Sequence, residues 1–369
     1  MSGTTATGNQ NLKPSKGLAM TYLVRFSIGS PSGGRSEIEN LNVIKKIREG
    51  FLDFPYASSQ AMKRALRDTL KGLGYTPLSP IINSSPAKTV GDPRSYIDDD
   101  LFGYMDASSK KSGNNEADRL NGTRKAVISM TPLISLSGFQ DNVDFGANMM
   151  GLRTGGNPMP YETEVHRGWY RVSLYVDLDR VGNGDGFVKE IKVVKEGVKP
   201  EDLQKEGLET YDFLEEKNDA FTLKKIEYNP LDNDTRYHRA KALIDAIRFL
   251  APSGRSSSWL VDLTPKLMVA TYVKGAKTPF LETQLLKQAG AEEARIDLDA
   301  IDQVRVNLSD GIEELAVGHR EDLFDHDYGA GTLKNMKATF DAVDGWLKRH
   351  FDVDSDSTQN SSSQTKLKS

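Results

Sequence analysis

The order of its periodic segments is the feature that most constrains how this chain can fold. Apolar residues alternate along some segments and recur every three or four positions along others. Strands are predicted at residues 20–28, 126–136, 169–178 and 267–273, and helices at 56–71 and 236–251. This order, βαββαβ, is that of ferredoxin-like domains and RNA recognition modules. We therefore predict an α+β fold built on a small sheet of this type.

Local signals predict where the two helices begin and end. Ser58 or Ser59 is expected to cap the first helix, because a short polar side chain accepts a hydrogen bond from the first free N–H groups. Asp234 or Thr235 is expected to cap the second helix in the same way. Pro252 then ends the second helix.

Further signals concern the strands and the C-terminal region. Pro132 makes residues 126–136 an edge strand or a bent strand. The turn at 183–186 is expected to join 169–178 to a strand at 187–194 as a hairpin. Residues 259–263 are strand-like, and residues 334–351 have the spacing of a further helix.

Two segments are too long for ordinary loops, at about 74–124 and 139–167. The second is dense in glycine and proline, so it is expected to project from the body as an arm. The predicted organisation is a flexible N-terminus at 1–19, a sheet domain at 20–275 with these two insertions, an α-rich extension at 276–351, and a polar, disordered tail at 352–369.

Composition excludes several classes of protein. Hydrophobic residues make up 37% of the 369 residues, which is typical of a folded core. Cysteine is absent, which excludes disulfides, thiolate metal sites and a cysteine nucleophile, and is typical of a reducing compartment. No apolar run approaches about 18 residues and the N-terminus is polar, so neither a membrane span nor a signal peptide is predicted. We expect a cytoplasmic protein.

The charge is unevenly distributed along the chain. The formal net charge is -4, which by itself argues against general nucleic-acid binding. Residues 1–75, however, hold eleven Lys/Arg against five Asp/Glu, whereas residues 196–235 hold five against twelve and residues 292–327 hold three against twelve. One region can therefore attract an anion that the others repel, unless these blocks are merely solvated surfaces.

The first predicted helix carries a basic stripe opposite its apolar side. The residues of the stripe follow one another at helical spacing: Gln60, Lys63, Arg64, Arg67 and Lys71. Three cations of the preceding segment add to the same region: Lys45, Lys46 and Arg48. Such a stripe can follow a phosphate backbone without reading bases, and an ordinary solvated helix is the alternative.

Two further segments have features of nucleic-acid contacts. Residues 253–258 combine Gly254, Arg255 and serines, which suits a phosphate, although a flexible turn is equally compatible. Arg167 begins a segment that partly matches the base-stacking motif of recognition modules, and a core position for Trp169 is the alternative.

Catalytic and metal signatures are weak. The standard phosphate-loop, hydrolase and zinc-protease motifs are absent, and the acidic loop with His319 and His326 is not predicted to bind a metal. Residues 98–100 are three consecutive aspartates, which supply oxygen ligands for a divalent cation but also occur in capped turns. We expect no metal and no cofactor.

Four segments together resemble the DevR-type Cas-seven proteins, the backbone subunits of type I-B-like CRISPR Cascade complexes. They are residues 56–70, 99–105, 166–171 and 175–182, which read YASSQAMKRALRDTL, DDLFGYM, HRGWYR and YVDLDRVG. The resemblance covers about residues 20–275.

The resemblance implies a hand-like fold with a palm, fingers at about 74–124 and a thumb at 139–167. It implies that copies stack along a guide RNA, grip its sugar-phosphate backbone and present its bases to a target DNA strand, together with other Cascade subunits. The RNA contacts implied by the resemblance or predicted from the residues are Lys45, Lys46, Arg48, Ser59, Gln60, Lys63, Arg64, Arg67, Met149, Met150, Arg153, His166, Arg167, Gly254, Arg255, Ser256, Ser257 and Ser258.

On this hypothesis the chain binds RNA and is not an enzyme. A metal-dependent ribonuclease that uses Asp98, Asp99 and Asp100 is one alternative. A structural scaffold that binds no nucleic acid is another.

Overall fold

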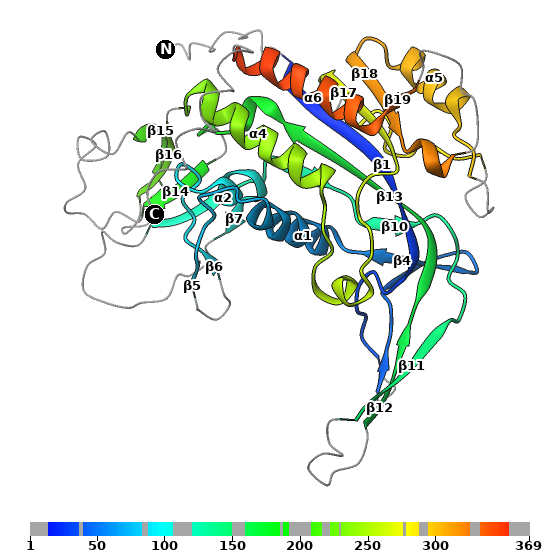
Figure 1. The fold of residues 1–369 in the computed structure, drawn as a ribbon. Coiled ribbons are helices and arrows are strands. Elements are labelled where there is room, and N and C mark those ends of the chain that lie inside the picture. Colours follow the sequence, from blue (N-terminus) through cyan, green and yellow to red (C-terminus); the bar gives the residue numbers. More distant parts are fainter. Residues whose placement is uncertain are drawn as a thin grey trace, which may run out of the picture.

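The computed structural model describes residues 14–36, 40–82, 88–105, 120–149, 159–184, 187–191, 208–215, 222–228, 230–275, 278–287, 294–324 and 333–353. Its centre is a nine-stranded sheet in the order β19-β18-β17-β1-β13-β10-β4-β3, with β9 paired to β13 off this path (Figure 1). The strands are β1 Lys16–Gly29, β3 Lys46–Glu49, β4 Leu52–Ala57, β9 Ile128–Met130, β10 Leu133–Ser135, β13 His166–Asp177, β17 Leu267–Lys274, β18 Ile312–His319 and β19 Lys334–Asn335.

Four helices pack against this sheet: α1 Ser59–Gly72, α4 Asn233–Arg248, α5 Leu298–Asn307 and α6 Met336–Phe351. Strand β1 shows why both faces are covered. Tyr22 and Val24 pack into a core with Leu66 of α1 and Leu243 of α4, whereas Leu23 points to a second core with Trp169. Figure 1 shows α1, α4 and α6 side by side over one face. The predicted α+β class is thus confirmed.

The helix starts are set by side-chain caps. Ser58 caps α1, because its hydroxyl accepts a hydrogen bond of 3.3 Å from the N–H of Ala61, as one of the two predicted serines. The predicted cap of α4 is wrong. Asp232 is the cap and accepts from the N–H of Thr235 at 2.8 Å, so Asp234 already lies in the first turn.

Of two strand predictions around β13, one agrees with the structure and one does not. The segment 126–136 forms two short strands, β9 and β10, which are interrupted at Pro132 as the bent-strand prediction requires. The predicted hairpin with residues 187–194 is wrong, since β14 (Phe187–Ile191) pairs with β8 (Leu120–Arg124). Strand β13 has no edge left for it, because β1 pairs along one side and β9 and β10 along the other.

Residues 259–263 are not a strand either. A 3₁₀ helix, η4, spans Gly254–Trp259, and Leu260 follows it in the left-handed conformation with φ 50°. This reversal ends the extended run that the apolar sequence suggested.

A long hairpin extends away from the body at the lower end of the sheet (Figure 1). Strands β11 (Val143–Asn148) and β12 (Met159–Glu164) form it, and β2 (Leu41–Asn42) pairs with β12 near its base. We call this hairpin the arm. It occupies the segment whose glycine and proline content predicted a projection.

The remaining elements lie outside the main sheet and the arm. They are β5 Ile81–Ile82, β6 Lys88–Thr89, α2 Ile97–Phe102, β7 Tyr104–Met105, η3 Leu178–Arg180, η5 Glu321–Leu323 and the pair β15 Leu208–Glu215 and β16 Thr222–Tyr228. Of the termini predicted to be flexible at 1–19 and disordered at 352–369, residues 1–13 and 354–369 lie outside the described residues. The predicted N-terminal boundary is wrong, since the central strand β1 already begins at Lys16 and Leu18 is buried. In the parts that the structure describes, no helix has the length and apolar character needed to cross a membrane.

Candidate nucleic-acid interface

The basic stripe of α1 points away from the core. The core side of the helix is formed by Met62, Ala65, Leu66, Thr69 and Leu70, so the charged side chains of the stripe lie on the other side. Arg64 is exposed and pairs with Asp68 one turn later at 3.0 Å, and Lys71 is also exposed. Because such an exposed pair is weak, Arg64 can exchange Asp68 for a phosphate at small cost.

Arg67 lies in a different environment from Arg64. Its Nε lies 3.7 Å from a carboxylate oxygen of Asp98 on α2, and its guanidinium lies 4.6 Å from the ring centre of Phe102. Burial lowers the pKa of Arg67, and Asp98 partly offsets that effect. Burial and the charge of Arg67 also lower the pKa of Lys63. The stripe is therefore less positive than its sequence suggests, because a carboxylate distant in sequence joins it.

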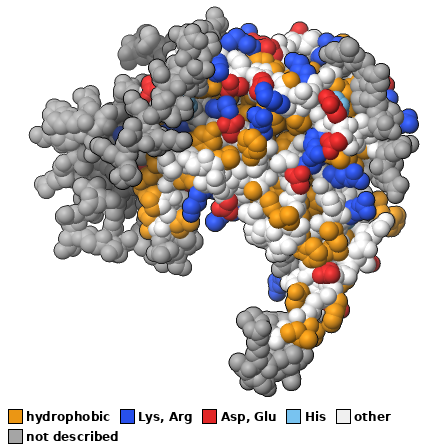
Figure 2. All heavy atoms as spheres, viewed as in Figure 1, with side chains coloured by type: hydrophobic (Ala, Val, Ile, Leu, Met, Phe, Trp, Pro, Cys, Tyr) orange, Lys and Arg blue, Asp and Glu red, His pale blue; other side chains and the backbone are white. Residues whose placement is uncertain are grey.

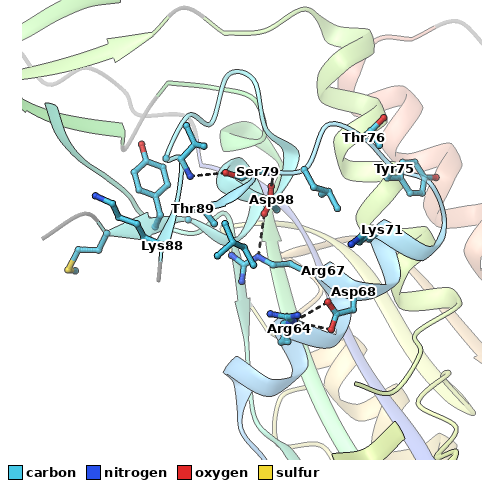
Figure 3. Close-up of a pocket in the computed structure, with 17 residues that line it drawn as sticks. Arg64, Arg67, Asp68, Lys71, Tyr75, Thr76, Ser79, Lys88, Thr89 and Asp98 are labelled. Atoms are coloured by element: carbon cyan, nitrogen blue, oxygen red, sulfur yellow. Dashed lines mark hydrogen bonds and ion pairs between the residues drawn. The ribbon is translucent and has the colours of Figure 1, made fainter. Parts of the chain in front are cut away.

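A cleft of about 840 Å³ opens between α1 and the β5–β6 hairpin (Figure 3). Basic and acidic side chains line it from α1 and α2, and Tyr104 and Met105 close the other side. Figure 3 shows Arg64, Arg67 and Lys71 along the helix with Asp98 opposite them. The full lining is Arg64, Arg67, Asp68, Lys71, Tyr75, Thr76, Leu78, Ser79, Ile81, Lys88, Thr89, Val90, Gly91, Asp98, Gly103, Tyr104 and Met105.

The three consecutive aspartates are committed to the fold. Asp98 accepts from the N–H of Ser79 at 2.8 Å, and Asp99 accepts from the N–H groups of Gly91 and Asp92 at 2.9 and 3.0 Å. Burial and the neighbouring Asp99 raise the pKa of the Asp98 carboxyl.

Asp100 is the most deeply engaged of the three. Its carboxylate binds Arg124, accepts from Arg239 at 2.8 Å and accepts from the N–H of Gly182 at 2.8 Å. Its side chain is fully buried. These partners leave the aspartates pointing apart rather than converging on one cation, so the geometry argues against the ribonuclease alternative. Among the described residues, no group of three or more acidic or histidine side chains is arranged to hold a metal.

Two of the three cations that precede α1, Lys46 and Arg48, are paired with acids. Lys46 lies 2.7 Å from Glu164 at the base of the arm and 3.7 Å from the ring centre of Phe139. Arg48 makes a two-pronged pair with Asp53, with both distances at 2.9 Å, on an exposed part of the β3–β4 hairpin. The predicted positive region is therefore smaller than expected, since Lys46 serves to fix the arm.

His166 was predicted to contact RNA, and its side-chain position contradicts this. The residue is buried, and its Nδ1 lies 2.7 Å from the hydroxyl of Tyr170, which accounts for a core role. Burial lowers the pKa of His166, so the ring is neutral near neutral pH. The neighbouring Arg167 is exposed, because successive side chains of β13 point to opposite faces.

Residues 253–258 form an ordered turn rather than a free loop. The predicted phosphate ligand Ser256 is buried, and its hydroxyl donates to the carbonyl of Pro31 at 2.9 Å. The hydroxyl of Ser257 donates to the carbonyl of Gly254 at 2.6 Å. Gly254 and Ser258 are exposed, and the side chain of Arg255 lies outside the described parts. Two of the four polar side chains expected to face phosphate are thus engaged by carbonyls of this chain, Ser257 within the turn and Ser256 with Pro31.

On the arm, Met149 is 57% exposed, as an apolar wedge would be, whereas Met150 and Arg153 lie outside the described residues. Further exposed apolar side chains follow the same hairpin: Val143, Phe145, Met159 and Tyr161. Figure 2 shows the molecule hollowed between the body and the arm. Helix α1, with exposed Gln60 and half-buried Ser59 at its start, η4 and the arm border this hollow in Figure 1.

Sequence reasoning missed the partners that complete the α1 site. Asp98 and Phe102 hold Arg67, and Lys88 and Tyr104 line the cleft. The one available signal was the unusual aspartate run itself, which was interpreted as a turn or a metal site. Lys45 is half-buried, and its N–H donates to the carbonyl of Ser32 at 3.1 Å; its RNA contact stays a prediction.

Comparisons with known proteins identify relatives. A protein of Myxococcus xanthus (strain DK1622), "CRISPR-associated protein Cas7/Cst2/DevR", is 36% identical over 98 residues, or 24% of this chain and 31% of that protein. This chain thus matches less than a third of that relative's length. Chains of a "CRISPR RNA-guided surveillance complex" and of a "CRISPR RNA-guided surveillance complex, pre-nicking" align at TM-scores of 0.48 and 0.49.

Those two alignments have 14% and 13% identity and cover 89% and 90% of this chain and 99% and 100% of the other chains. The family model described as "CRISPR-associated negative auto-regulator DevR/Csa2" matches residues 83–288. That match takes in α2, the arm, β13, α4 and β17, which is more than half of the chain. This chain therefore belongs to the DevR/Csa2 family of CRISPR-associated proteins.

Proposed function

We propose that this protein is the RNA-gripping backbone subunit of a type I-B-like Cascade complex. Copies bind side by side along a guide RNA, hold its sugar-phosphate backbone and leave its bases open to a target DNA strand. Membership in a CRISPR-associated family supports this assignment. The proposal further includes other Cascade subunits as partners and no catalytic step.

The observation that carries the proposal is the outward basic side of α1 at the border of the hollow. Lys63, Arg64 and Lys71 lie along one helix beside a projecting arm, and their burial ranges from half-buried to exposed. Cations spaced along a helix neutralise successive phosphates and carry no sequence information. Such contacts suit a guide whose base sequence varies.

Binding rather than catalysis is supported by the state of the acidic residues. The only three consecutive aspartates are bound to arginines and backbone N–H groups of the same chain. Removing them from these partners to bind metal would leave buried cations unpaired, at a cost of about 3–5 kcal/mol.

The test compares two triple variants that remove the same charge. Lys63→Gln, Arg64→Gln and Lys71→Gln are changed together on α1, and Lys337→Gln, Lys348→Gln and Arg349→Gln together on α6. The α1 variant should bind single-stranded RNA at least about tenfold more weakly, and its plot of log affinity against log salt should be shallower by about 2. The α6 variant should bind like the wild type.

Filter binding at several salt concentrations measures both quantities, and thermal melting checks that both variants fold. Equal weakening in the two variants would mean that binding follows total charge only. Unchanged binding in the α1 variant would overturn the proposal.

A further inference from the structure

The cleft beside α1 has features that phosphate binding leaves unexplained. Four basic side chains line it against two acidic ones: Arg64, Arg67, Lys71 and Lys88 against Asp68 and Asp98. Its walls also contain apolar and aromatic groups, of which Val90 is 45% exposed and Met105 is 76% exposed. A ligand that fits this lining is anionic overall and has a flat, partly apolar part that enters the cleft.

Arg67 and Asp98 present a donor beside an acceptor. Their closest atoms are 3.7 Å apart, which is longer than a hydrogen bond. Within the described residues, the Nε of Arg67 has no hydrogen-bond partner, although the atom is buried. The Arg67 side chain as a whole is 29% exposed, so its terminal nitrogens remain accessible from the cleft. Arg67 and Asp98 are thus close enough to contact the same ligand, and their mutual contact leaves hydrogen-bonding capacity for it.

Both members of this pair are held rigidly. The ring of Phe102 lies behind the Arg67 guanidinium at 4.6 Å, which fixes its plane and leaves the other side toward the cleft. Asp98 is 6% exposed, and its second oxygen accepts from the N–H of Ser79 at 2.8 Å. A planar cation held in this way keeps its N–H donors in a fixed direction beside the Asp98 acceptor, which suits the edge of a nucleobase.

We propose that this cleft binds a single nucleobase of the RNA strand, whose flanking phosphates lie at Arg64 and Lys71. The inference rests on the proposed function, because the ligand belongs to the same strand. Each RNA base carries a hydrogen-bond donor next to an acceptor on its pairing edge. Asp98 and Arg67 therefore satisfy any of the four bases, and the site tolerates a variable sequence.

The experiment uses the full chain and a single-stranded RNA that contains 4-thiouridine. Irradiation joins this base to side chains in direct contact, and mass spectrometry of the digest identifies them. The wild type should form a cross-link to Tyr104 or Met105. Val90→Trp fills the cleft from its exposed rim and should reduce this cross-link at least about fivefold, whereas total RNA affinity should fall less than about threefold.

Arg67→Lys is a second variant that keeps the charge but loses the planar group, and Arg64→Lys is its matched control. The first should reduce the cross-link and the second should not, because only Arg67 is backed by a ring. Melting curves verify the fold of each variant.

The outcomes separate this inference from the proposed function. RNA that binds the wild type without any cross-link at Tyr104 or Met105 would overturn the base site and leave the proposed function intact. A cross-link that persists in Val90→Trp would do the same. If the wild type does not bind RNA at all, the proposed function itself fails. Loss of self-association in Val90→Trp without RNA would show that a protein segment occupies the cleft, which contradicts the base site.

Discussion

Arg239 of α4 donates a hydrogen bond of 2.8 Å to the buried carboxylate of Asp100 on α2. Its guanidinium also donates to the carbonyls of Pro93 and Arg94, both at 2.6 Å. Arg124 binds the same carboxylate from the other side. This network fastens the inserted segment around α2 to the helices that cover the main sheet, so the cleft beside α1 has a fixed opposite wall.

We expect Arg239→Met to destabilise the protein by about 3–5 kcal/mol, because a buried carboxylate loses one of its two cations. Urea unfolding of the full chain measures the change. Asp53→Asn removes an exposed carboxylate from Arg48 and serves as the control, with no measurable effect expected. A loss below about 1 kcal/mol in Arg239→Met would show that the network adds little to stability.

Shortening the arm should leave the fold intact and abolish ordered assembly on RNA. Residues 145–162 are replaced by Asn-Gly. Because Asp144 and Thr163 are paired across the hairpin, this two-residue turn can join them directly. Stability should hardly change, because Phe145 is 68% exposed and Met159 is 66% exposed. Glu164 must be kept, since it holds Lys46 and the N–H of Ile44. Thermal melting tests whether the shortened protein folds, and electron microscopy of RNA-bound samples tests whether it still assembles in order. A broad, early melting transition would show that the arm belongs to the core.

Stability should decrease in mild acid. Burial lowers the pKa of His166 and of His350 below the ordinary 6.5. Between those lowered values and about 6.5, the unfolded chain binds more protons than the folded one, so the free energy of unfolding falls as the pH falls through this window. The stability that the two neutral histidines contribute is fully present above about pH 6.5.

The pH effect of His166 is measured by urea unfolding at pH 7.5 and 5.5. His166→Gln should lose less stability on acidification than the wild type, because a neutral amide replaces the titrating ring. An identical acid loss in this variant would assign the effect to other groups.

Leu260→Gly should stabilise the protein by about 1 kcal/mol. Leu260 adopts φ 50°, a conformation that costs a non-glycine residue about 1–2 kcal/mol, and it is 88% exposed, so little packing is lost. Ser258→Gly, two residues earlier within η4, is the matched control and should reduce stability, since it only increases the freedom of the unfolded chain. The melting temperatures of the two variants, compared with that of the wild type, test this prediction. A lower melting temperature for Leu260→Gly would contradict this explanation.

Local periodicity was enough to predict the main elements. The predictions for β1, α1, β13, α4 and β17 succeeded because an element buried on one face, or on both, must carry its apolar residues at its own repeat. The cap at Ser58 was predictable for a related reason, since a helix end satisfies its free N–H groups with residues next to it in sequence. The arm followed from glycine and proline content.

The relationships between distant segments were decided by the tertiary structure. Strand β14 pairs with β8 because both sides of β13 are occupied, and no property of residues 187–191 shows that. His166 is buried because Tyr170, on the same face of β13, binds its ring within the core. Sequence alone gave each side chain its chemistry. Whether that chemistry faces solvent or is neutralised depends on partners brought close by the fold.

The α1 site shows the division most clearly. Sequence determined that Arg64, Arg67 and Lys71 share one side of a helix, because helical geometry is local. Only the fold placed Asp98 and Phe102 against Arg67 and left Arg64 and Lys71 open to solvent. The physical reason is that the energy of a charge depends on its burial and on the charges within a few ångströms, and both are set by packing between segments far apart in the chain.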